Sequence, residues 1–168
     1  LVFMLLGTVG CGKSVAASAV ATELGDAREV AFHGGQFSEA HQVLKLIGAP
    51  PSYVGFDESG ELVAAINRGA RVLIFDELSL FHKTARNLIE RLVDQGIVTS
   101  GAGVDLRFDG VILFTDNADL HTRRRSLGFQ AGGVGAATDP VAWSKRALGA
   151  RLASRLGSAS FVQFEEVG

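Results

Sequence analysis

The 168-residue sequence is long enough for one domain with a substantial core, and its 47% hydrophobic content agrees with that. Its net charge of −2 excludes an overall electrostatic attraction to nucleic acid or to anionic membranes. Cys11 is the single cysteine, so no disulfide forms within the chain, and no apolar stretch approaches the roughly 18 residues of a membrane span. We expect a cytoplasmic domain and, because the sequence opens directly on strand residues, a part of a longer protein.

The first feature along the chain is a glycine-rich loop between a strand and a helix. Residues 7–14 read G-T-V-G-C-G-K-S, which fits the pattern G-x-x-x-x-G-K-[ST] in full. Residues 1–6 form an apolar run typical of a buried parallel strand, and the Ala-rich residues 15–24 favour a helix. Glycines let the backbone wrap phosphate oxygens, and successive N–H groups beside a helix N-terminus attract anions. This predicts a site for a nucleoside triphosphate.

Each polar residue of this loop has an expected role. Lys13 is expected to reach the β- and γ-phosphates, and the Ser14 hydroxyl to hold Mg²⁺. Cys11 is either a reactive thiol or a filler at a variable position, and we interpret it as filler. The expected nucleotide-binding residues are Gly7, Thr8, Val9, Gly10, Cys11, Gly12, Lys13, Ser14, Val15 and Asp76.

The next segments carry less chemistry. Residues 28–32 are apolar enough for a second strand, and residues 37–47 have a helical spacing of apolar side chains. His33, His41 and His82 share no metal-ligand spacing, so we expect solvated or hydrogen-bonded histidines.

A proline-containing loop follows, reading G-A-P-P-S-Y-V-G-F-D over residues 48–57. Two prolines exclude regular structure, and glycines flank Tyr53, the only tyrosine. Composition leaves two alternatives open, since this ring is either presented outward or folded back on the core. Residues 61–67 then form an amphipathic helix.

Two further strands end in polar residues. The apolar strand beginning at residue 72 closes on Asp76 and Glu77, and ligands of parallel sheets lie beyond the carboxyl ends of strands. This places Asp76 beside the Mg²⁺ of Ser14, and lets Glu77 polarise an attacking water. Residues 81–93 are helical and residues 100–103 form a flexible loop, after which a strand over residues 110–115 is followed by Asn117.

The last third of the chain contains an unexplained apolar pair. Leu127 and Phe129 flank a glycine inside the basic, glycine-rich segment 121–135, and they either tuck under the loop or await a partner. A helix is expected over residues 139–156, and a last strand over residues 161–164. Five strands alternating with helices predict a doubly wound α/β sheet.

Four stretches together resemble the second ATPase module of the Clp unfoldases, in the AAA+ superfamily. They are residues 7–14, residues 46–57, the strand through Asp76 and Glu77, and residues 94–96 with the loop that follows. Residues 56–57 and 124–129 are most similar to the ClpA branch. The resemblance implies a P-loop NTPase (AAA+) fold with a five-stranded parallel sheet sandwiched by helices. Residues 1–168 would be the large α/β ATPase subdomain, without the C-terminal helical lid.

The resemblance also implies roles for individual residues. Glu77, Asn117 and Arg155 would be the catalytic carboxylate, the γ-phosphate sensor and the arginine finger of a neighbouring subunit's site. Ser14 and Asp76 would bind Mg²⁺, and the cofactors would be ATP and Mg²⁺. Tyr53 and Val54 would form the pore loop that grips substrate. Leu127, Gly128 and Phe129 would dock onto a ClpP-like peptidase.

The implied assembly is a homohexameric ring that threads unfolded polypeptide, with no nucleic acid or membrane partner. The sequence departs from the Clp pattern at Ser52, at Ser79 and at Val104, where the family usually has Gly, a charged residue and Arg. A degenerate module that binds nucleotide only to build the ring is one alternative, and the intact Lys13, Asp76, Glu77, Asn117 and Arg155 argue against it. Two further alternatives are a disaggregase of the same fold without a peptidase, and a nucleic-acid-remodelling AAA+ ATPase. The apolar tripeptide argues against the disaggregase, and the lack of basic residues in the Tyr53 loop argues against the nucleic-acid-remodelling ATPase.

Overall fold

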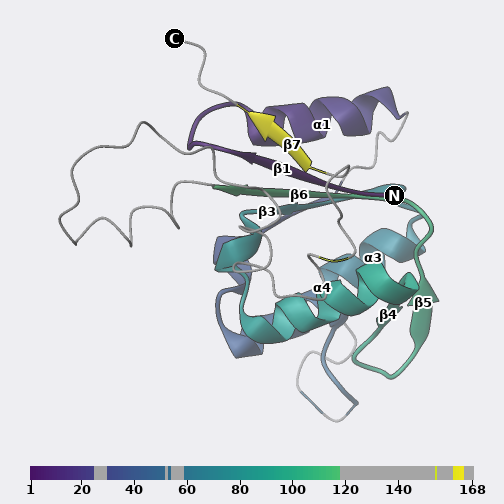
Figure 1. The fold of residues 1–168 in the computed structure, drawn as a ribbon. Coiled ribbons are helices and arrows are strands. Elements are labelled where there is room, and N and C mark those ends of the chain that lie inside the picture. The colour runs from purple at the N-terminus through teal and green to yellow at the C-terminus, as the bar shows by residue number, and fades with distance from the viewer. Residues whose placement is uncertain (25–29, 52, 54–58, 118–153, 155–160, 165–168) are drawn as a thin grey trace, which may run out of the picture.

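The computed structural model describes residues 1–24, 30–51, 53, 59–117, 154 and 161–164. Figure 1 shows a central sheet with α1 on one face and α3 and α4 on the other. The strands are β1 Val2–Gly7, β2 Val30–His33, β3 Val72–Asp76, β4 Ile97–Thr99, β5 Asp105–Arg107, β6 Val111–Asn117 and β7 Phe161–Phe164. The helices are α1 Lys13–Glu23, α2 Val43–Ile47, α3 Glu61–Asn67 and α4 Lys83–Gln95, with 3₁₀ turns η1 Gly34–Phe37, η2 Ala40–Gln42 and η3 Leu78–Leu80.

The main sheet has the strand order β2-β3-β6-β1-β7, and all of its pairings are parallel. The prediction of a five-stranded parallel sheet sandwiched by helices is therefore confirmed. The register pairs Gly7 with Asn117 and His33 with Asp76. Because parallel strands end at the same edge, the residues at the carboxyl ends of β1, β2, β3 and β6 converge there.

The central strands β1, β3 and β6 are buried on both faces, and alternate residues serve two separate cores. Leu5 packs with Ala17 and Ala21 of α1 on one face. Its neighbours Met4 and Leu6 belong to the larger core on the opposite face, which the other helices cover. This explains why the strand sequences read as continuous apolar runs rather than as an alternation of polar and apolar residues.

Five buried phenylalanines form a continuous aromatic cluster in the larger core. Phe32, Phe75 and Phe114 lie on the adjacent strands β2, β3 and β6, with ring centroids 5.2 Å and 5.6 Å apart. Phe37 and Phe81 stack on each other at 5.6 Å, and each also contacts a ring of the strand row. The rings of these pairs pack in stacked, tilted or edge-on arrangements, which aromatic side chains favour.

The structure adds two short strands on either side of the segment expected to be a flexible loop. Residues 100–103 form the turn of an antiparallel hairpin, β4–β5, closed by a hydrogen bond from Ser100 N to the Val104 carbonyl at 2.8 Å. Each strand of this hairpin has three residues, which is too short for an alternating pattern to reveal it.

The expected helix over residues 37–47 is divided. A capping box of Glu39 and Gln42 starts a new turn, so two 3₁₀ turns precede the short helix α2. The expected helix over residues 139–156 lies outside the described residues, apart from the helical Ser154. In the described part of the chain, no helix combines the length and apolarity needed to cross a membrane.

Candidate active site

The phosphate loop joins β1 to α1 at the carboxyl edge of the sheet. Gly10 and Gly12 have φ angles of 86° and 90°, in the left-handed region that glycine adopts without strain. Gly12 is the N-cap of α1, so the first N–H groups of that helix lie beside the loop. A cavity of about 330 Å³ opens here and is lined by Val9, Gly10, Gly12, Lys13, Ser14, Val15, Asp76, Glu77, Thr115 and Asn117. The loop and the strand ends therefore share one cavity.

Lys13 and Thr8 give this loop the character of an anion site. Lys13 Nζ donates to the carbonyl oxygens of Gly7 at 3.0 Å and of Thr8 at 2.6 Å, and it lies 3.7 Å from Cys11 Sγ. Thr8 Oγ1 is the one buried side-chain nitrogen or oxygen of the described residues that lacks a hydrogen-bond partner. An ammonium, an unsatisfied hydroxyl and a helix N-terminus together fit a phosphate group.

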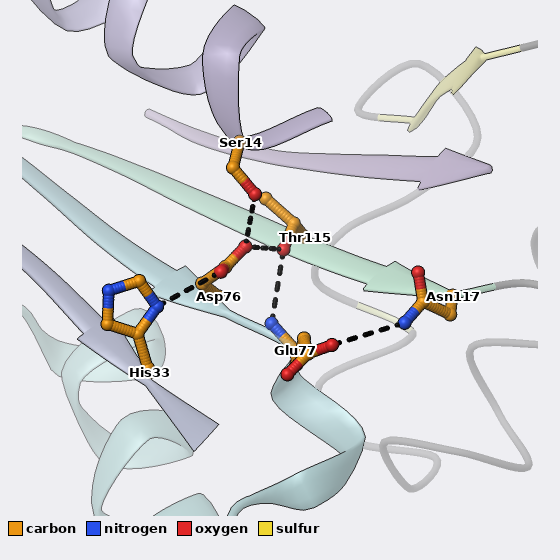
Figure 2. A network of polar contacts seen from close by, with 6 residues as sticks. All are labelled: Ser14, His33, Asp76, Glu77, Thr115 and Asn117. Atoms are coloured by element: carbon orange, nitrogen blue, oxygen red, sulfur yellow. Dashed lines mark hydrogen bonds and ion pairs between the residues drawn. The ribbon is translucent and has the colours of Figure 1, made fainter. Parts of the chain in front are cut away.

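Asp76 ends β3 at the centre of the hydrogen-bond network in Figure 2. Its Oδ1 accepts from Ser14 Oγ at 2.9 Å and from Thr115 Oγ1, and its Oδ2 lies 3.1 Å from His33 Nδ1. Burial raises the pKa of Asp76, but the hydrogen bonds from Thr115, Ser14 and His33, with the charge of His33, outweigh burial and lower the pKa below its ordinary value. Asp76 is therefore ionised at neutral pH.

Ser14 and Asp76, the predicted magnesium residues, present a hydroxyl and a carboxylate oxygen 2.9 Å apart. Mg²⁺ prefers oxygen donors, and it commonly takes one or two carboxylates together with phosphate and water oxygens. The two residues come from α1 and β3 and meet beside the phosphate loop. Their chemistry fits Mg²⁺.

Glu77 turns the chain out of β3 in an unusual backbone conformation. Its φ of 56° is the only positive value among the non-glycine residues that the structure describes. Its N–H donates to Thr115 Oγ1 at 3.1 Å, and its Oε1 accepts from Asn117 Nδ2 at 3.3 Å. Such conformations cluster at functional sites, where the surrounding structure holds them. The sheet therefore brings Glu77 and Asn117 together (Figure 2).

Asp116 fixes the segment that follows Glu77. It is fully buried, and its carboxylate accepts from Ser79 N at 2.7 Å, from Ser79 Oγ at 2.9 Å and from Asn117 N at 2.7 Å. Ser79 is one of the positions at which the sequence departs from the Clp pattern. The contact with Asp116 gives this serine a structural partner, and it ties the turn η3 to the end of β6.

Tyr53 is 65% exposed, so the structure agrees with outward presentation of this ring. Three glycines, which we call the glycine junction, meet at the base of its loop. Gly48 and Gly60 are at the two ends of the loop, and Gly101, in the hairpin β4–β5, packs against Gly48. A Cβ at Gly101 would overlap the Gly48 carbonyl, and a Cβ at Gly60 would overlap the Gly48 nitrogen. The Gly101 N–H also donates to the Ile47 carbonyl at 2.8 Å. The hairpin therefore supports the base of the Tyr53 loop directly.

Several predicted site residues lie outside the described residues. They are Val54 of the expected pore loop, the expected arginine finger Arg155, and the expected docking residues Leu127, Gly128 and Phe129. Their roles stay predictions.

Sequence reasoning missed His33 and Thr115 as members of the site. Both contact the Asp76 carboxylate, and each directly follows a phenylalanine of the aromatic cluster, as Asp76 itself does. A polar residue at the end of each neighbouring strand was the available signal. It becomes informative only once the strand order and register are known.

Comparisons with known proteins agree with this geometry. Residues 1–134 match the family model described as AAA domain (Cdc48 subfamily). The chain is 34% identical over 133 residues to the ATP-dependent Clp protease ATP-binding subunit ClpE of Streptococcus pneumoniae, a match that covers 77% of this chain and 18% of that protein. It is 35% identical over the same length to ClpE of Lactococcus lactis, with the same coverage.

A second group of relatives carries a different name. The chain is 39% identical over 120 residues to the chaperone protein ClpB of Meiothermus ruber, a match that covers 68% of this chain and 14% of that protein. The chain thus spans less than a fifth of the length of each of these three relatives.

Proposed function

Because the chain belongs to the AAA domain family (Cdc48 subfamily), and is a Clp-type AAA+ ATPase module within it, we propose that it is the motor of an ATP-driven protein unfoldase. The observation that carries the proposal is the convergence of the phosphate loop, Asp76, Glu77 and Asn117 on one cavity, in a domain that also presents Tyr53 to solvent. A nucleotide site and an exposed aromatic loop residue in one domain are what a motor that moves polypeptide requires.

The residues of the cavity divide the chemistry among them. The loop N–H groups and Lys13 would hold the phosphates, and Ser14 and Asp76 would hold Mg²⁺. When bound, Mg²⁺ neutralises charge on the phosphate oxygens. The Glu77 carboxylate would accept a proton from the attacking water, while Asn117 fixes the orientation of that carboxylate.

The rest of the proposal concerns the assembly. Residues 1–168 would be the large ATPase subdomain of each subunit in a cytoplasmic homohexamer. Arg155 would complete the neighbouring subunit's site, which would make hydrolysis depend on assembly. Tyr53 and Val54 would grip unfolded polypeptide in the pore, without a nucleic acid or membrane partner.

The relatives support two versions of this function. The name of ClpE includes a protease, which favours delivery of substrate to a ClpP-like peptidase through Leu127, Gly128 and Phe129. The name of ClpB includes only a chaperone, which favours remodelling without proteolysis as the second candidate.

The nucleotide site is tested by replacing its lysine. Lys13→Ala should abolish ATP binding, because it removes the ammonium that completes the phosphate loop. Lys45→Ala, on the exposed side of α2, is the matched control and should bind as the wild type does. Wild-type affinity in Lys13→Ala, measured by isothermal titration with ATP, would contradict the proposed site.

The two versions are separated by co-sedimentation. The full-length parent protein, with ATP, is sedimented with a ClpP-type peptidase, for the wild type and for Leu127→Ala/Phe129→Ala. Association that is lost in the double variant supports the degradative version. No association in either protein supports the chaperone version and leaves the ATPase site unaffected.

A further inference from the structure

His33 is a part of the site that the sequence pattern did not indicate. It ends β2, and the parallel register of β2 and β3 sets it directly beside Asp76. Its Nδ1 lies 3.1 Å from Asp76 Oδ2, and its side chain is 55% exposed whereas that of Asp76 is 15% exposed. Figure 2 shows His33 and Ser14 approaching the Asp76 carboxylate from different sides.

The donor in this hydrogen bond follows from the state of its partner. An aspartate carboxylate is ordinarily ionised at neutral pH, and an ionised carboxylate only accepts hydrogen bonds. The hydrogen must therefore be on His33 Nδ1. Both the neutral ring with hydrogen on Nδ1 and the imidazolium can supply this donor.

The two oxygens of Asp76 are held from different directions. Oδ1 accepts from Ser14 on α1 and from Thr115 on β6, whereas Oδ2 accepts from His33 on β2. The χ2 torsion of an aspartate is intrinsically broad, so a carboxylate held at one oxygen can still rotate. A donor at each oxygen fixes its plane and keeps Oδ1 on the side of Ser14.

We propose that His33 is a positioning residue, which holds the Asp76 carboxylate in the orientation that binds the divalent cation. This inference rests on the proposed role of Ser14 and Asp76 in holding Mg²⁺. Hydrogen-bond partners of metal ligands orient them, and the loss of such a partner typically weakens metal binding about tenfold to a hundredfold.

Because Nδ1 is the donating atom, substitutions of His33 can be chosen that either keep or remove a donor at that position. His33→Asn places an amide N–H near the position of Nδ1, so it should keep the hydrogen bond to Asp76. His33→Gln extends its amide beyond that position, and His33→Ala removes the donor altogether. His41→Ala removes an exposed histidine of η2 and is the matched control.

The experiment measures binding of Mn²⁺, as a probe for the Mg²⁺ site, to the full chain with ADP by electron paramagnetic resonance. We expect His33→Ala and His33→Gln to weaken Mn²⁺ binding about tenfold to a hundredfold. We expect the Mn²⁺ affinities of His33→Asn and His41→Ala to stay within about threefold of the wild type. This change is smaller than the one that follows when a metal ligand loses its hydrogen-bond partner. Nitrogen NMR of the wild-type ring, without metal, should show hydrogen on Nδ1.

The outcomes separate the two proposals. Wild-type Mn²⁺ affinity in His33→Ala would overturn the role of His33 and leave the metal site in place. Equal losses in His33→Asn and His33→Ala, or hydrogen on Nε2 alone in the wild-type ring, would overturn it as well. If the wild type itself does not bind Mn²⁺ with ADP, the proposed metal site is overturned and the role of His33 with it.

Discussion

The active-site edge and the glycine junction are held together by opposite means. At the edge, polar side chains from α1, β2, β3 and β6 bind one another around Asp76. At the glycine junction, the Tyr53 loop and the hairpin β4–β5 meet through backbone atoms, at positions where a side chain does not fit. Substitutions at the active-site edge should therefore mainly change ATP turnover, whereas substitutions at the glycine junction should mainly change the packing of the backbone and so the free energy of unfolding.

The largest expected effect tests the chemical half of this comparison. Glu77→Gln should lower ATP turnover about 10²–10⁴-fold, because an amide cannot take a proton from water. Nucleotide should stay bound, because the new amide oxygen can still accept from Asn117 Nδ2 and the geometry of the site is therefore preserved. Phosphate release and retention of labelled ATP measure the two effects in the full-length protein. Glu23→Gln, exposed on α1, is the control, and undiminished turnover in Glu77→Gln would exclude Glu77 from catalysis.

The geometric half is tested at the junction. Gly101→Ala should lower the free energy of unfolding by about 1–3 kcal/mol, because its Cβ overlaps the Gly48 carbonyl. Gly35→Ala introduces a Cβ into open space and should change stability by less than about 0.5 kcal/mol. Urea unfolding measures both, and nucleotide affinity should be unchanged in both. Equal unfolding midpoints would contradict the close packing of the junction.

Asp116 allows a test of whether the edge also contributes to stability. Asp116→Asn should lower the free energy of unfolding by about 1–2 kcal/mol. The new amide nitrogen replaces one carboxylate oxygen, and it cannot accept the hydrogen bonds which that oxygen receives from Ser79 or Asn117. When Asp116→Asn is combined with Ser79→Ala, the loss of unfolding free energy should be less than the sum of the two single losses, since both changes weaken the same contact between these residues. Asp109→Asn is the exposed control, and strict additivity in urea unfolding would contradict the coupling.

The smallest expected effect on stability lies at the tip of the loop. Tyr53→Ala should change the free energy of unfolding by less than about 0.5 kcal/mol and leave ATP turnover intact, because the ring is exposed. Unfolding of a tagged fluorescent substrate by the full-length protein should nevertheless stop, and Tyr53→Phe should restore it. Undiminished substrate unfolding in Tyr53→Ala would mean that the ring does not grip polypeptide.

The same contrast explains what could be predicted from sequence. The phosphate loop, Asp76 and Glu77 are visible because glycine spacing and strand-end carboxylates are local patterns, and the apolar runs predicted all five strands of the main sheet. His33 and Thr115 are invisible locally, since their contact with Asp76 depends on the order β2-β3-β6 and on the register between these strands.

The glycine junction and the hairpin were missed for a related reason. Gly48, Gly60 and Gly101 look like ordinary loop glycines, and only their approach in space distinguishes them. The three-residue strands β4 and β5 carry too few side chains to show a period, and their turn has the composition of a flexible loop.

The aromatic cluster has a mechanical consequence for the polar residues above it. Phe32, Phe75 and Phe114 each precede a residue that binds or forms the central carboxylate, and their rings interlock across three strands. One strand cannot slide past the next without displacing a ring that is buried in a close-packed core. We therefore expect the three strand ends to move together as one rigid unit. In the proposed motor, a nucleotide-driven movement would then occur in the loops around these strand ends rather than within the sheet.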